Sequence, residues 1–184
     1  MDNRIKILKN MLHNNNVKIY VDDKDNIIIE GDIIIYDNEY NNFPVKLYRV
    51  NGNIEWHGNT DGMKSGSLSS FKNFPDIVTG NVYVYGNNKL QTLKNCPKEI
   101  GGTFDCSNCN ISDISDISEK IKGHLHLQNN PIYNVDVLSK VYIGGNIYIY
   151  NTNWSKLTEN KHIETISDSS LIITNKISYE FTEH

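Results

Sequence analysis

The chain has 184 residues, 38% of them hydrophobic, with a net charge of −4 and a pI near 5.8. This length allows one domain, and the modest apolar content favours an elongated architecture over a deep compact core. The charge argues against unspecific binding to a nucleic-acid backbone, which needs clustered Lys and Arg. The sequence has no run of about 18 apolar residues, and its first ten residues carry charges throughout. We therefore expect neither a membrane span nor a signal peptide.

The N-terminal segment has the pattern of a cap. Residues 3–13 (NRIKILKNMLH) place Ile5, Leu8 and Leu12 on one helical face. The segments VKIYV and NIIIE, separated by DDKD, are typical of a hairpin. A solenoid needs such an element because its open end exposes core and sheet edge. We therefore predict a cap of helix and hairpin over residues 1–26.

A repeat follows, and it is the strongest signal in the sequence. Six segments share the pattern apolar, any, Gly, any, apolar, any, apolar: IEGDIII, VNGNIEW, VTGNVYV, IGGTFDC, IKGHLHL and IGGNIYI. Their glycines are 21, 28, 22, 21 and 22 residues apart, at Gly31, Gly52, Gly80, Gly102, Gly123 and Gly145. The longer interval contains a polar, Gly-rich insertion near residues 60–67. After it, LSSFKNFP restores the register that LQTLKNCP shows one repeat later.

Each repeat continues in the same way. The positions two and four residues after Gly are apolar in every case, which predicts a strand with one buried side. These pairs are Ile33/Ile35, Ile54/Trp56, Val82/Val84, Phe104/Cys106, Leu125/Leu127 and Ile147/Ile149. A corner residue comes three positions later, and its side chain can bond backbone groups of the turn. The corner residues are Asn38, Asn59, Asn87, Cys109, Asn130 and Thr152.

This layout predicts the fold class. An apolar pair spaced by three residues follows each corner, as in a leucine-rich repeat, whose period is about 20–29 residues. We predict a mostly β, leucine-rich-repeat-like solenoid with a short parallel strand per repeat of 21–22 residues. It comprises six repeats over residues 27–159, and residues 160–184 form a C-terminal cap or tail. The glycine before each strand serves either a special backbone conformation or the close approach of the preceding turn.

The cysteines allow two interpretations. Cys106 and Cys109 form a CxxC pair with Cys96 upstream and two histidines downstream, which is the composition of a zinc site. In the repeat register, however, Cys106 occupies an inward strand position, Cys109 a corner, and Cys96 the apolar position before proline. We therefore interpret all three as structural thiols and predict no metal or cofactor. Their odd number fits a reducing compartment.

The outward strand face is the candidate binding surface. It consists of the residues one, three and five positions after each glycine, and tyrosines and histidines gather there. Tyr combines apolar area with a hydroxyl and is enriched at interfaces. The alternatives are that Tyr is simply a good strand residue, and that the histidines and carboxylates are solvated. The predicted contact residues are Tyr36, His57, Tyr83, Tyr85, Asp105, His124, His126, Tyr148 and Tyr150.

Catalytic motifs are absent from the sequence. It has no nucleophile elbow, no HExxH and no phosphate-binding Gly-rich loop. The outward carboxylates Glu55 and Asp105 are expected to lie on a strand face without a deep pocket, so they are more typical of solubility than of acid–base chemistry. We therefore predict that the protein is not an enzyme.

Two runs carry a family resemblance: FPDIVTGNVYVYGNNKLQTLKNCPKEIGGTFDCSNCNISDI and GDIIIYDNEYNNFPVKLYRVNGN. Over roughly residues 3–157 the chain resembles the degenerate leucine-rich-type repeat proteins of T-even-type tailed bacteriophages. The resemblance implies a monomer in the host bacterial cytoplasm that binds a host protein, most specifically an inhibitor of host RNA polymerase that shuts off transcription. An inhibitor of a bacterial anti-phage defence protein and a virion structural part are the alternatives. No functional residue can be carried over from the family.

Overall fold

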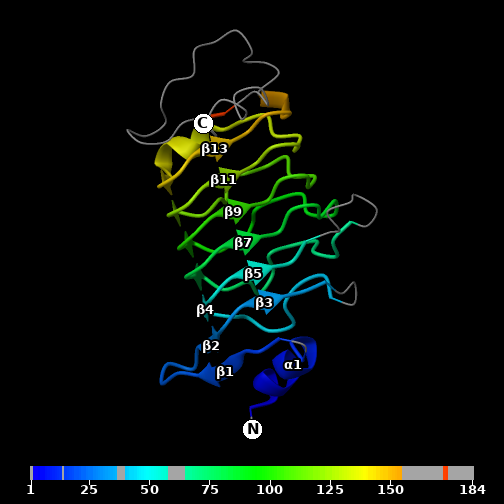
Figure 1. Cartoon of the computed structure of the whole chain (residues 1–184), viewed down its shortest axis with the longest axis vertical. Helices are drawn as coiled ribbons and strands as arrows, with labels where there is room; N and C mark the ends of the chain where they lie inside the picture. The colour runs from blue at the N-terminus through cyan, green and yellow to red at the C-terminus, as the bar shows by residue number, and fades with distance from the viewer. Residues whose placement is uncertain (1, 14, 37–39, 58–64, 155–171, 174–184) are drawn as a thin grey trace, which may run out of the picture.

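The chain folds into a parallel β-solenoid of about five turns, seen from the side in Figure 1. This computed structural model describes residues 2–13, 15–36, 40–57, 65–154 and 172–173. The turns stack along the long axis from the N-terminus to the C-terminal side, and two ladders of short strands run the length of the stack. The predicted solenoid with turns of about 22 residues is confirmed.

The N-terminal cap is the helix and hairpin that the sequence predicts. Helix α1 (Asn3–Met11) begins after Asp2, whose carboxylate accepts a hydrogen bond of 2.8 Å from the backbone N–H of Arg4. The helix buries Leu8 completely against the first turn. Strand β1 (Lys18–Val21) pairs antiparallel with β2 (Ile27–Glu30). Because β2 also pairs with the first parallel strand, the cap continues into the solenoid through a shared sheet.

Two sheets make up the solenoid, and each turn contributes one short strand to each. Sheet A starts with β1 and β2 and continues through β4 (Arg49–Asn51), β6 (Ile77–Val78), β8 (Glu99–Ile100), β10 (Lys120–Ile121) and β12 (Tyr142–Ile143). Sheet B is formed by β3 (Ile33–Ile34), β5 (Ile54–Glu55), β7 (Val82–Tyr83), β9 (Phe104–Asp105), β11 (Leu125–His126), β13 (Ile147–Tyr148) and β14 (Ile172–Ile173). The described returns from sheet B to sheet A contain the 3-10 helix η1 (Asp136–Lys140) and an isolated parallel bridge between Thr92 and Asp113.

Sheet B is formed by the strands that the repeat pattern predicts. Sheet A is formed by a second strand in each turn, which the pattern did not predict. From β4 onward, the strands of sheet A end just before each repeat glycine and bury one aliphatic side chain apiece, such as Val78 and Ile100. Most are two or three residues long, so they contain too little alternation for a period of two to be recognised. The second sheet is therefore established by pairing with neighbouring turns rather than by local pattern.

The repeat glycines lie at the junction between the two sheets, and close packing explains them. Gly31 has a positive φ of 109°, but the other five repeat glycines do not lie in that region. Instead they stack on one another: the N–H of Gly123 donates to the carbonyl of Gly102 at 2.9 Å. A Cβ on Gly123 would lie 2.6 Å from the carbonyl carbon of Gly102. Of the two roles predicted for these glycines, the close approach of the preceding turn is the one that applies along the stack.

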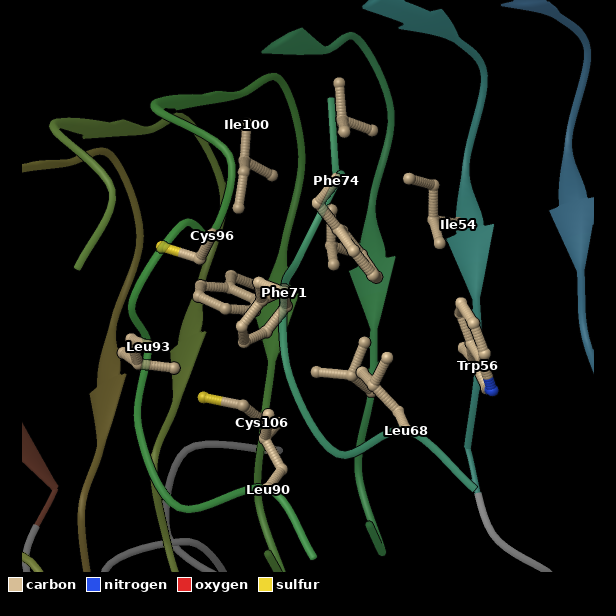
Figure 2. Packing of buried hydrophobic residues seen from close by; sticks show 14 of the residues in the cluster. Ile54, Trp56, Leu68, Phe71, Phe74, Leu90, Leu93, Cys96, Ile100 and Cys106 are labelled. Carbon is tan, nitrogen blue, oxygen red and sulfur yellow. The ribbon is translucent and has the colours of Figure 1, made fainter. Parts of the chain in front are cut away.

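The core is a continuous stack of inward side chains, part of which Figure 2 shows. All twelve of the apolar side chains predicted to point inward are buried. Aromatic rings fill the turns next to the insertion: Phe43 lies 5.3 Å from Trp56 and 4.9 Å from Phe74 between ring centroids, and Phe71 lies 4.8 Å from Phe74. The indole N–H of Trp56 donates to Ser67 Oγ at 2.9 Å, so the one polar atom of the ring is satisfied.

The corner residues bond the backbone of the turn, as predicted. Asn87 is fully buried, donates to the carbonyls of Trp56 (2.7 Å) and Val84 (2.8 Å), and accepts from the N–H of Leu68 (2.8 Å). Asn130 makes the equivalent three bonds two turns later. Asn38 and Asn59 lie outside the described residues. These buried amides close the turn where the backbone itself leaves groups unpaired.

Two parts of the predicted organisation are only partly described by the structure. Of the insertion near 60–67, residues 65–67 are described, and Gly66 N–H donates to the carbonyl of Gly86 at 2.9 Å. Of the tail 160–184, only β14 is described, paired in parallel with β13. Within the described part of the chain, no helix has the length and apolar character needed to cross a bilayer.

Candidate binding face

The outward side chains of sheet B form three parallel columns, which we call the B face. The columns are the residues one, three and five positions after each repeat glycine, and the strand register holds them one above another. Neighbouring rungs are about 4.8 Å apart, so side chains in one column are in contact range. All nine predicted contact residues lie in these columns: Tyr36, His57, Tyr83, Tyr85, Asp105, His124, His126, Tyr148 and Tyr150.

The first column is a hydrogen-bonded ladder. The Asp32 carboxylate accepts from the N–H of Asn53 at 2.7 Å, and Asn53 Oδ1 accepts from the N–H of Asn81 at 2.7 Å. Asn81 Oδ1 accepts in the same way from the N–H of Thr103, and Thr103 Oγ1 accepts from the N–H of His124. These side chains satisfy backbone donors at the junction between the sheets. The polar character of this column therefore has a structural cause.

His124 belongs to that ladder. Its Nδ1 accepts a hydrogen bond of 2.9 Å from the N–H of Asn146, which requires Nδ1 to be unprotonated. His124 is therefore a backbone partner of the next turn, in addition to its predicted place on the outward strand face. Its ring is exposed and lies 5.8 Å from that of Tyr148, so the residue also contributes to the B face.

Two aromatic groups cover the ends of the B face. In the first, the rings of His57 and Tyr85 stack with centroids 4.4 Å apart, and Tyr36 meets His57 edge-on at 5.8 Å. In the second, His126 and Tyr148 stack at 4.4 Å. Tyr36 is 72% exposed, whereas the stacked rings are half-buried. Stacking fixes these rings before any partner arrives, so they lose little conformational freedom on binding.

A tyrosine between two carboxylates occupies the centre of the B face. Tyr83 pairs with Glu55 on one side and with Asp105 on the other, and Asp105 pairs with His126 on the next rung. One oxygen of Asp105 accepts from the N–H of Ser107 at 2.9 Å. Burial raises the pKa of Tyr83 and Tyr85, and the negative charges of Asp105 and Glu55 raise it further. The centre of the face therefore has a negative potential and neutral phenols.

His126 is the second half-buried titratable group at this centre. Burial lowers the pKa of His126 below its ordinary value; the Asp105 charge opposes this shift and His124 adds to it. Gln128 Nε2 lies 3.4 Å from His126 Nδ1. The other amide atom, Gln128 Oε1, is buried and has no hydrogen-bond partner among the described residues. Rotating the amide would place Oε1 near His126 Nδ1, where it could accept if that nitrogen carried the proton.

The three cysteines have the structural positions that the repeat register predicts. All are free and buried. Cys109 Sγ donates to the carbonyl of Val84 at 3.3 Å, as the corner asparagines do with their amides. Cys106 Sγ lies 3.5 Å from the carbonyl of His126, and Cys96 Sγ lies 3.3 Å from that of Asp116. Burial raises the pKa of Cys96 and Cys109 to about 12 and that of Cys106 well above its usual value, so the thiols stay protonated.

The outer face of sheet A differs in its chemistry. An open hollow of about 610 Å³ lies against it, lined by Glu99, Glu119, Lys120, Lys122 and Tyr142. The lining of this hollow thus combines two acids with two lysines. Lys120 Nζ lies 5.9 Å from the centroid of the Tyr142 ring, so this exposed tyrosine already has a cation of the chain over it.

Two residues of the B face lie outside the predicted set of contact residues. Glu55 was interpreted as a solubilising carboxylate, yet it lies beside Tyr83 and 3.9 Å from His57 Nε2. Gln128 was assigned to the outward face but not to the contact residues, and it contacts His126. The alternation of the strand places both on the face and brings each beside a histidine two positions away. The contact of Glu55 with Tyr83, in contrast, depends on pairing between turns 28 residues apart.

Comparison with protein-family models, with curated proteins and with solved structures found no match. The protein is therefore classified by its fold and by its B face. It is a parallel β-solenoid, capped by a helix and a hairpin, with a preformed aromatic face on one of its two sheets.

Proposed function

We propose that this chain is a non-catalytic binding protein whose B face docks onto a partner protein. The observation that carries the proposal is the pair of stacked aromatic groups, His57 with Tyr85 and His126 with Tyr148, on a scaffold with a continuous buried core. The described corner side chains of this scaffold bond the backbone. Rigid rings of this kind supply large contact area at small entropic cost. A few such anchors account for most of the energy of an interface.

The mechanism is occlusion by a preformed surface. The B face is continuous over six rungs of sheet B. At about 4.8 Å a rung it is about 24 Å long, which suits an interface of ordinary size. Binding would cover a site on the partner without any rearrangement of the solenoid.

The resemblance to T-even-type phage repeat proteins makes the proposal more specific. In this form the partner is a host protein in the bacterial cytoplasm, and the leading partner is host RNA polymerase, whose inhibition shuts off transcription. The alternatives are a bacterial anti-phage defence protein as the target and a structural role in the virion. The resemblance supports these assignments, whereas the proposal of a binding face rests on the geometry.

The test uses purified bacterial RNA polymerase and immobilised protein in a binding measurement, followed by capture from bacterial lysate. The test variant is Tyr83→Ala with Tyr85→Ala, and the matched control is Tyr142→Ala, which removes a 59% exposed ring from sheet A. Circular dichroism verifies that each variant is folded. We expect the double variant to lose at least about 30-fold in affinity, from about 1–3 kcal/mol per anchor, and the control to bind normally.

The outcomes separate the candidates. Binding of polymerase by the wild type and the control alone supports transcription shut-off through the B face. Capture of one other bacterial protein with the same pattern retains the face and changes the target. Equal binding by the double variant would refute the B face as the docking surface. Self-association of the wild type on a sizing column would favour the structural role.

A further inference from the structure

The B face has an unusual charge pattern for this chain. Its outward positions include three carboxylates, Asp32, Glu55 and Asp105, and not one Lys or Arg. The chain as a whole has 18 Lys and Arg against 22 Asp and Glu, so composition does not explain the absence. The outward side chains on and beside the strands of sheet A include Lys18, Arg49, Lys120 and Lys122.

The tyrosines of the two sheets differ accordingly. On sheet A the chain supplies the cations itself, since Lys18 Nζ lies 5.5 Å from the ring centroid of Tyr20 and Lys120 Nζ lies 5.9 Å from that of Tyr142. On the B face the neighbours of Tyr83 along its column are the carboxylates of Glu55 and Asp105. An aromatic ring between two acids is a favourable place for a cation, which would gain from both ring and charge.

If a partner covers Asp105, the charge of that partner determines whether removing water from the carboxylate is favourable. Asp105 is half-buried, and the one hydrogen bond that its side chain makes within the described part of the chain comes from the backbone N–H of Ser107. An apolar or acidic partner would remove water from this carboxylate and leave its charge unpaired, which is strongly unfavourable. A partner with an Arg or Lys at this point would replace the lost water by an ion pair.

We infer that the B face recognises a basic segment of its partner and that one Arg or Lys side chain of that segment binds between Tyr83 and Asp105. The inference rests on the proposed function, because it specifies the chemistry of the partner for the same face. Glu55 on the far side of Tyr83 extends the negative surface toward the first aromatic group. The stacked rings then contact the apolar parts of the segment.

A peptide titration of the full chain tests the inference without the natural partner. The probe is a short synthetic peptide with two arginines separated by glycine, and the control peptide has citrulline, a neutral isostere, at both positions. Nuclear magnetic resonance of the isotope-labelled protein follows the backbone signals of Tyr83, Asp105 and His126. We expect the arginine peptide to shift these signals with a Kd in the millimolar range. The citrulline peptide should bind at least fivefold more weakly.

Two variants with the same change in charge locate the site. Asp105→Asn keeps an oxygen that can accept from Ser107, and we expect it to weaken the arginine peptide at least fivefold. Glu99→Gln removes one carboxylate from the exposed side of sheet A and should leave binding within twofold. No shifts at millimolar arginine peptide, equal binding of the citrulline peptide, or equal losses in the two variants would each overturn the inference. The proposed function is tested separately, since capture that depends on Tyr83 and Tyr85 but not on Asp105 would retain the docking face and refute the basic partner.

Discussion

The two sheets of the solenoid share one core and one register, yet their outer faces carry different side chains. Sheet A presents lysines, arginine and glutamates in a mixed pattern, with a cation of the chain over Tyr20 and over Tyr142. Sheet B presents stacked rings and carboxylates with no Lys or Arg. Strand formation requires neither pattern, because both sheets pair equally well. Folding explains the inner sides and the first column of the B face, and the proposed docking function would account for the rest of the difference.

Both sheets pack on the same core, so a substitution in the core should destabilise both faces together. Phe74 is fully buried and contacts Phe43, Phe71 and Trp56. We expect Phe74→Ala to lower the free energy of unfolding by about 3–5 kcal/mol through lost burial and a cavity. Urea denaturation followed by circular dichroism measures this. A loss below about 1 kcal/mol would mean that the aromatic cluster is not packed as described.

A corner residue tests the next largest effect. Asn130→Ala removes an amide that bonds Ile111 N–H and the carbonyls of Cys106 and Leu127, leaving buried groups unsatisfied. We expect a loss of about 2–3 kcal/mol in the same denaturation measurement. Asn110→Ala, at an exposed position nearby, is the matched control and should change stability by less than about 0.5 kcal/mol. Similar losses in the two variants would contradict the structural role of the corner.

Substitution of one tyrosine on each sheet compares how much the two outer faces contribute to stability. Tyr85 is half-buried and stacked on His57, whereas Tyr142 is 59% exposed. We expect Tyr85→Ala to lower the free energy of unfolding by about 1–2 kcal/mol and Tyr142→Ala by less than about 0.5 kcal/mol. Thermal denaturation of both variants measures the difference. Equal losses would show that the stacking on the B face adds nothing to stability.

The smallest expected effect is the pH dependence at His126. Burial lowers the pKa of the folded His126 below 6.5, so the unfolded chain takes up this proton more readily. The free energy of unfolding should therefore fall as the pH is lowered from 6.5 toward the folded pKa, and this contribution is absent above 6.5. His126→Gln should flatten that part of the stability profile.

The control for this pH effect is His13→Gln, at an exposed position after helix α1. Denaturant melts at several pH values between 5 and 7.5 compare the slopes of wild type and both variants. An unchanged slope in His126→Gln, or the same change in His13→Gln, would show that the charge of His126 is not suppressed by the fold.

Much of this protein follows from its sequence alone. The recurrence of Gly, of two inward apolar residues and of a polar corner determined the solenoid, its period, the buried positions and the role of the corner asparagines. These features repeat in every turn, and each depends on strand alternation or on contacts with the adjacent copy of the same pattern. The helix and hairpin at the N-terminus were also predictable, because their patterns are local.

Other features were decided only by the tertiary structure. The second sheet has strands too short to show a period, so it exists through pairing between turns. The same pairing turned His124 into a backbone partner of Asn146, brought Glu55 beside Tyr83, and stacked His57 on Tyr85. These contacts join residues about 20–30 positions apart, across repeats of unequal length. The physical reason is that alternation fixes only the side of a strand on which a residue lies, while the alignment of neighbouring turns fixes what it contacts.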